Sequence, residues 1–195
     1  TMLEITKGIS SDHYLSQLLK SIMDNRTLND ENMAKILSLT KDISSDHYKT
    51  SILKKALKNK NLSTKAYNQF LSSVNDIKSD HYTSSVVSEL LKNKLDNSSL
   101  DRVLQMIGDN VGSDHYASNL YSKIIKKNTL SESQLIKLMQ SASNNISSSH
   151  SLTRVLTSLS SQVNKSSNRV KAAYRNAAKK IKSDSYYGRV LKAID

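Results

Sequence analysis

The chain has 195 residues, no cysteine, no proline and four glycines, and its formal net charge is +12. The absence of cysteine excludes a disulfide scaffold, a thiolate zinc site and a thiol nucleophile. No apolar run approaches the roughly 18 residues of a membrane span. Scarce glycine and proline argue against an all-β protein with many tight turns, so the composition indicates a folded, mostly helical chain.

A six-residue motif recurs along the whole chain. Its first copy is Ile9-Ser10-Ser11-Asp12-His13-Tyr14. Further copies begin at Ile43, Ile77 and Val111, and two degenerate copies begin at Ile146 and Ile181. The steps between copies are 34, 34, 34, 35 and 35 residues, a regularity that predicts a helical-repeat architecture.

Each repeat is expected to form two helices, in the order that the first repeat shows. Apolar residues follow the motif at helical spacing and predict a helix of about three turns; they are Tyr14, Leu18, Leu19, Ile22 and Met23. A second helix is then expected to begin where an apolar residue precedes an N-cap residue, as in Leu28-Asn29. The N-cap residues expected for the second helices are Asn29, Ser63, Asp96 and Ser131.

The motif itself is interpreted as a helix start. Either its serine caps the helix, or its aspartate does so; in the first case the aspartate stabilises the first turn through the helix dipole. The tyrosine is expected to point into the stack of helices. We therefore expect the aspartates and tyrosines to hold the repeats together: Asp12, Tyr14, Asp46, Tyr48, Asp80, Tyr82, Asp114 and Tyr116.

These patterns predict one all-α domain over residues 1–195. The expected fold is a right-handed α-α superhelix, or solenoid, of about five to six helical-hairpin repeats. Met2, Leu3 and Ile5 have the spacing expected at the end of a second helix, and the chain stops within a first helix. We expect a fragment of a longer protein, with half-repeat caps as the alternative.

The repeated Ile-x-Ser-Asp-x-Tyr pattern resembles the Ser-Asp-Tyr-type helical repeats of bacterial envelope proteins and of antirepressor-type metallopeptidase proteins. The repeat length is also that of tetratricopeptide repeats, although their Trp and Pro signature is missing. The resemblance implies a HEAT-like region for interaction or sensing. The chain differs in having His between Asp and Tyr, and it has no His-Glu-x-x-His, so metallopeptidase chemistry does not carry over.

The histidines occupy the same motif position in five repeats: His13, His47, His81, His115 and His150. Equivalent residues of neighbouring helices lie roughly 10 Å apart, whereas metal–nitrogen bonds are about 2 Å long. We therefore expect no metal site, although a zinc-dependent or pH-sensing array remains a third hypothesis. No nucleophile elbow or phosphate loop occurs, so we expect no catalytic residue and no cofactor.

Positive charge gathers at the C-terminal end. Residues 164–195 contain nine basic and two acidic residues. A candidate anion-binding face consists of Lys171, Arg175, Lys179, Lys180 and Lys182. The first three of these share one helix face by their spacing, and such a face attracts phosphates or acidic partners.

The leading functional hypothesis is a non-catalytic scaffold that binds a protein or peptide. The alternative is a solenoid that binds anions or nucleic acid through the basic C-terminal repeat. No row of exposed aromatic residues accompanies the basic ones, which disfavours nucleic acid. A monomer is expected, and the absence of cysteine fits the bacterial periplasm or envelope as well as the cytoplasm.

Overall fold

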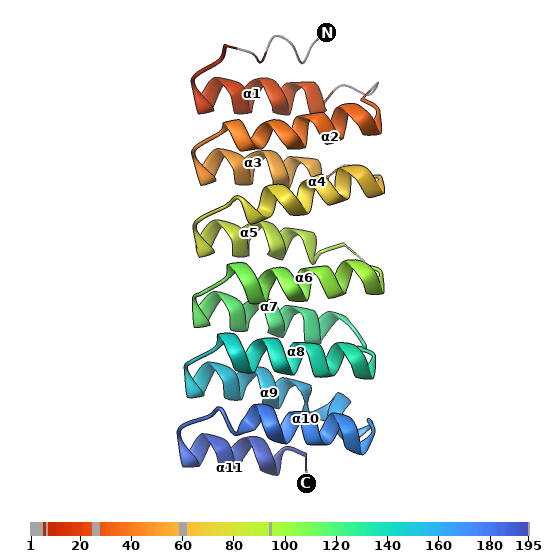
Figure 1. Cartoon of the computed structure of the whole chain (residues 1–195), viewed down its shortest axis with the longest axis vertical. Coiled ribbons are helices and arrows are strands. Elements are labelled where there is room, and N and C mark those ends of the chain that lie inside the picture. Colours follow the sequence, from red (N-terminus) through yellow and green to blue (C-terminus); the bar gives the residue numbers. More distant parts are fainter. Residues whose placement is uncertain (1–5, 7, 25–27, 59–61, 94, 195) are drawn as a thin grey trace. The chain divides into compact units, whose positions relative to one another are not determined.

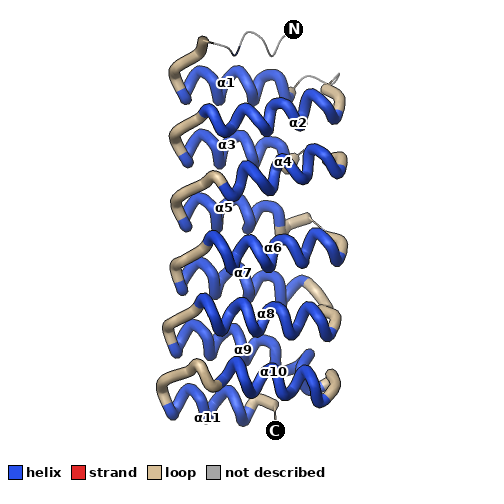
Figure 2. The backbone as a smooth tube through the Cα atoms, viewed as in Figure 1, coloured by secondary structure: helices blue, strands red, loops and turns tan. Residues whose placement is uncertain are grey.

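A computed structural model describes residues 6, 8–24, 28–58, 62–93 and 95–194. Every regular element in these residues is a helix and none is a strand, which confirms the all-α class (Figure 2). The helix end expected over Met2, Leu3 and Ile5 lies outside the described residues. The helices are α1 (Asp12–Met23), α2 (Asp30–Ser38), a 3-10 helix η2 (Leu39–Asp42), α3 (Asp46–Ala56), α4 (Thr64–Asn75), α5 (Asp80–Leu90), α6 (Asn97–Asn110), α7 (Asp114–Lys127), α8 (Glu132–Asn145), α9 (Ser149–Asn164), α10 (Asn168–Ala178) and α11 (Asp184–Lys192).

The helices form two compact units, one with α1 to α5 and the other with α6 to α11. Within each unit, every helix packs against the helix two places further along the chain. In the first unit, α1 packs on α3, α3 on α5, and α2 on α4 (Figure 1). In the second, α6, α8 and α10 form one row, and α7, α9 and α11 form the other. This alternation is how stacked helical hairpins bury a shared apolar core.

The motif starts the first helix of each pair, as predicted, and its serine is the N-cap residue. Ser11 precedes α1 and accepts a hydrogen bond from the backbone N–H of Tyr14. Ser148 makes the equivalent bond to Ser151 at the start of α9. The motif aspartate is therefore the first residue inside the helix, for example Asp12 in α1, where its charge favours the helix dipole.

All four predicted N-cap residues of the second helices are confirmed. The side chains of Asn29, Ser63, Asp96 and Ser131 each accept a bond from the backbone N–H three residues on. Ser131 is part of a complete capping box, because the Gln134 side chain also accepts from the Ser131 backbone N–H at 3.0 Å. The N-cap residues read from the sequence therefore mark where these helices begin.

The core lies between the two helix rows of each unit. The apolar residue that opens each motif after the first is buried: Ile43, Ile77, Val111, Ile146 and Ile181. Tyr121 and Tyr174 are the largest fully buried side chains among the described residues. Neither of these tyrosines belongs to the motif.

Candidate functional site

The motif aspartate of one repeat binds the motif of the next repeat. Asp12 Oδ2 accepts hydrogen bonds from the backbone N–H of Ser45 at 2.8 Å and of Ser44 at 3.1 Å. Equivalent bonds join Asp46 to Lys78 and Ser79, and Asp114 to Ser147 and Ser148. Each carboxylate therefore satisfies two backbone donors beside the next N-cap, which is a charge-assisted link between successive helices.

The last of these links uses a hydroxyl group. In the degenerate fifth motif, Ser149 stands in place of aspartate, and its Oγ accepts from the backbone N–H of Lys182 at 3.2 Å. Asp80 is half-buried as the first residue of α5. The linked motif side chains are thus half-buried and hydrogen-bonded within the fold.

The prediction that the motif tyrosines lie inside the stack is wrong for Tyr14 and holds only in part for the other three. Tyr14 is 69% exposed, and Tyr48, Tyr82 and Tyr116 are half-buried. The buried stripe of α1 begins one residue later, at Leu15. The tyrosine follows the helical period of the apolar residues, but its position is rotated toward solvent.

Each motif tyrosine instead packs on exposed imidazole rings. His13 contacts Tyr48 of the next motif, with ring centroids 5.6 Å apart and Nδ1 3.3 Å from the hydroxyl. The ring of His47 lies 6.1 Å from that of Tyr82. In the second unit, His150 lies 5.9 Å from Tyr186. These histidines therefore lie near the helix N-termini and pack against tyrosine rings. No group of three or more metal-ligating side chains occurs in the described part of the chain.

Adjacent serine, aspartate and histidine in the motif have separate partners. Ser11 Oγ accepts from Tyr14, Asp12 reaches the next motif, and His13 Nε2 lies 3.0 Å from the Gln17 amide. A catalytic triad needs these three groups in contact with one another. The first motif therefore does not assemble a nucleophile with its base.

The basic candidate residues lie on and just after α10. Lys171 and Arg175 belong to α10, Lys179 caps its C-terminus, and Lys180 and Lys182 follow in the turn to α11. No carboxylate of the described residues pairs with these five side chains. Residues 93–195 contain sixteen basic and seven acidic residues, a net charge of +9, so these cations stand in a strongly positive unit. Those at the end of α10 are also stabilised by the helix dipole.

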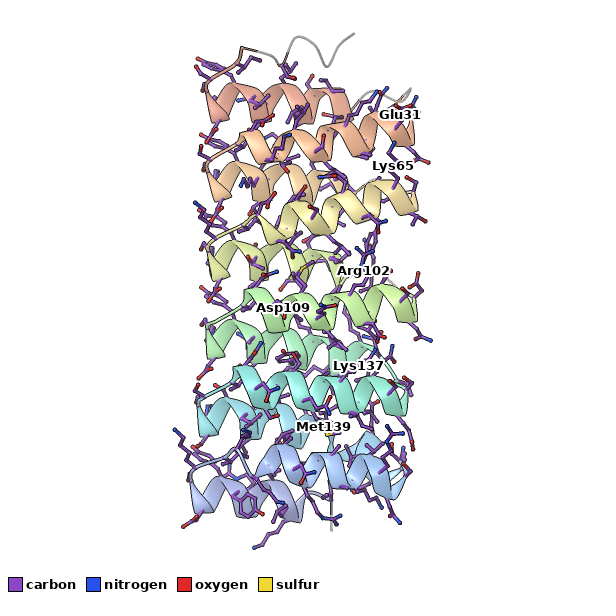
Figure 3. The ribbon with its side chains drawn as sticks, in the orientation of Figure 1. Glu31, Lys65, Arg102, Asp109, Lys137 and Met139 are labelled. Atoms are coloured by element: carbon purple, nitrogen blue, oxygen red, sulfur yellow. The ribbon has the colours of Figure 1, made fainter. Side chains whose placement is uncertain are left out.

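A feature that sequence reasoning missed is a cleft of about 400 Å³ between α6 and α8. We call it the α6–α8 cleft. Its lining from α6 is Asp101, Arg102, Leu104, Gln105, Gly108 and Asp109. Its lining from α8 is Lys137, Gln140, Ser141, Asn144 and Asn145. Figure 3 shows that Arg102 and Asp109 come from α6 and Lys137 from α8.

The two helices approach closely at the base of the cleft. A Cβ atom on Gly108 would lie only 2.7 Å from Ser141 Oγ, so a larger residue there would require the Ser141 side chain to move. Asn145 donates to the Gly108 carbonyl, and Ser141 Oγ lies 2.6 Å from the hydroxyl of Tyr121. Burial raises the pKa of Tyr121 to about 12, so this hydroxyl remains neutral at physiological pH.

The rim of the cleft is polar and exposed to solvent. The side chains of Gln105, Asp109, Gln140 and Asn144 are exposed and have no hydrogen-bond or ion-pair partner within the described residues. At one end, Lys137 pairs with Asp101 Oδ2 at 2.5 Å, whereas Asp101 Oδ1 is buried without a partner. Among the sites described, this cleft alone combines a concave shape with several unused donors and acceptors.

Comparison of the chain with models of protein families, with curated proteins and with solved structures finds no match. No helix within the described residues has the length and apolar character needed to cross a membrane.

Proposed function

We propose that the chain is a non-catalytic helical-repeat scaffold that binds a protein or peptide partner. The observation that carries this proposal is the α6–α8 cleft, in which the side chains of Gln105, Gln140 and Asn144 have no partner among the described residues. A volume of about 400 Å³ lies within the range of ligand-binding clefts. The motif residues, in contrast, are engaged in links between repeats.

We propose that the helical hairpins continue one another as a right-handed α-α solenoid of about five to six repeats, and that the chain is a monomer. The regular motif spacing and the alternating helix contacts within each unit support this arrangement. The resemblance to Ser-Asp-Tyr-type repeats supports a role in interaction or sensing.

Selection from a random peptide library tests the function. The full chain is immobilised, and short random peptides displayed on phage are enriched against it. Individual synthetic peptides are then titrated into the chain by isothermal calorimetry. Saturable binding of selected peptides is the expected result, and a failure of every selected peptide to bind in solution would overturn the proposal.

A second candidate function is binding of nucleic acid through Lys171, Arg175, Lys179, Lys180 and Lys182. The observation that favours it is that none of these cations has a carboxylate partner among the described residues, and that all except the half-buried Lys171 are exposed. Fluorescence anisotropy with labelled single- and double-stranded nucleic acid tests it across a salt series. Binding that persists at physiological salt and is lost when Lys171, Arg175 and Lys179 become glutamate supports this function. Binding that vanishes near 0.15 M salt would mean that these basic residues form a solvated surface and not a nucleic-acid site.

A further inference from the structure

We propose that the α6–α8 cleft holds a short, extended peptide segment that carries one lysine or arginine side chain. The cleft amides bind the peptide backbone, and Asp109 binds the cation. This inference rests on the proposed function, because it names the class of ligand and the place where it lies. Four properties of the cleft support it: its amides, its length, its charge distribution and its base.

The amides match the hydrogen-bonding groups of a peptide backbone. Each glutamine or asparagine side chain offers one carbonyl acceptor and two N–H donors, the same kinds of group as a peptide unit. Gln105 stands on one wall, and Gln140 and Asn144 stand on the other; all three amides are without a partner. An extended backbone between the walls exposes its N–H and C=O groups to both sides, and so it satisfies the amides without depending on side-chain sequence.

The length of the cleft sets the length of the segment. Asp101 and Asp109 mark its two ends on α6, and eight residues of α-helix rise about 12 Å. An extended chain advances about 3.3–3.6 Å per residue, so about four residues fit along the cleft. The segment is therefore a short linear motif.

The charges place the basic side chain at one end. Lys137 stands near Asp101, to which it is paired, and Arg102 lines the same end. These cations repel a basic ligand group there. Asp109 lies two helical turns beyond Asp101 and has no cationic partner among the described residues. A lysine or arginine of the peptide neutralises it.

The base of the cleft explains why a backbone can approach. Gly108 presents no side chain to the groove, and Leu104 provides an apolar contact.

The test is a double-mutant cycle between the chain and a peptide from the library selection. Asp109→Asn and the Gln105→Ala, Gln140→Ala double variant change the cleft. Asp184→Asn changes an exposed carboxylate at the start of α11 and serves as the matched control. The peptide is used as selected and with its basic residue replaced by glutamine. Thermal unfolding first checks that each variant remains folded, since none of the altered side chains has a partner.

The proposal expects about a tenfold loss of affinity in Asp109→Asn and a larger loss in the double amide variant. It also expects no change in Asp184→Asn. The glutamine peptide should bind wild type about tenfold more weakly, yet bind Asp109→Asn no more weakly than the selected peptide does. Peptides that bind all variants equally would overturn this inference while leaving the peptide-binding function intact. A chain that binds no peptide overturns both.

Discussion

Asp114 Oδ2 accepts a hydrogen bond of 2.7 Å from the backbone N–H of Ser148, the residue that caps the next helix of the same row. A bond of 3.0 Å from Ser147 to Oδ1 accompanies it. One carboxylate therefore joins the start of α7 to the start of α9. The same relationship joins Asp12 to Ser45 and Asp46 to Ser79. This link explains why aspartate follows the capping serine in these motifs.

Removing the link should destabilise the second unit. We expect Asp114→Ala to lower the free energy of unfolding by about 2–3 kcal/mol, because two backbone donors lose a charged acceptor. Asp184→Ala is the control, since Asp184 also opens a helix but has no bond to a further motif in the described residues. It should cost only the helix-dipole contribution of about 0.3–1 kcal/mol. Urea denaturation measures both values, and equal losses would contradict the link.

The loss of stability on replacing a tyrosine by alanine should depend on how deeply the tyrosine is buried. Tyr174 is fully buried and donates to the Val190 carbonyl at 3.2 Å, so Tyr174→Ala should cost about 3–5 kcal/mol. Tyr14→Ala should cost about 0.5 kcal/mol or less, because its ring is mostly in water. Thermal denaturation of the two variants checks this order. A large loss at Tyr14 would restore the view that motif tyrosines form the core.

Stability should fall at alkaline pH, and Tyr121 should contribute to this loss together with Tyr174, whose pKa is also raised by burial. The pKa of Tyr121 is raised from 10.0 to about 12 in the folded chain, mainly by burial. Between these values the unfolded chain releases the proton while the folded chain retains it, so the free energy of unfolding decreases with rising pH. The loss amounts to about 2–3 kcal/mol by the upper end of the window.

A variant isolates this contribution. Tyr121→Phe should lose about 1 kcal/mol at neutral pH, since the bond to Ser141 disappears, but it should lose less stability than wild type on going to about pH 12. Tyr14→Phe, which alters an exposed phenol, is the control. Urea denaturation at both pH values gives the comparison. A parallel fall in wild type and Tyr121→Phe would show that Tyr121 does not cause the alkaline loss.

The capping box at the start of α8 should matter for stability. Ser131→Ala removes the bond to Gln134 N–H and should lower the free energy of unfolding by about 1 kcal/mol. Ser133→Ala changes an exposed serine two residues further on and should be neutral or slightly stabilising, because alanine favours the helix. Chemical denaturation distinguishes the two. A neutral Ser131→Ala would mean that packing alone fixes the helix start.

Local signals predicted the helix starts well. Ser11 and Ser131 cap through their own side chains, and capping depends on a few neighbouring residues that sequence displays directly. The burial of Tyr14 was misjudged because its spacing fits the apolar stripe, while the stripe is centred on Leu15 and Leu19. A helical period gives the face of a residue only to within about a quarter turn.

The α6–α8 cleft could not be found in this way. Its walls come from residues such as Gln105 and Gln140, which are far apart in sequence and carry no motif. Both Gly108 and Ser141 line it, and their closeness is a property of tertiary packing. Gly108 within an otherwise helical pattern was the only local sign.

The most direct test of peptide binding in the α6–α8 cleft is an NMR titration of the isotopically labelled full chain with a library-selected peptide. Backbone amide shifts should concentrate on α6 and α8, with the largest changes around Gln105, Asp109 and Gln140. The exposed face of α10 should change little. Shifts centred on Lys171, Arg175 and Lys179, with none in the cleft, would contradict binding in the cleft and place the binding site on α10.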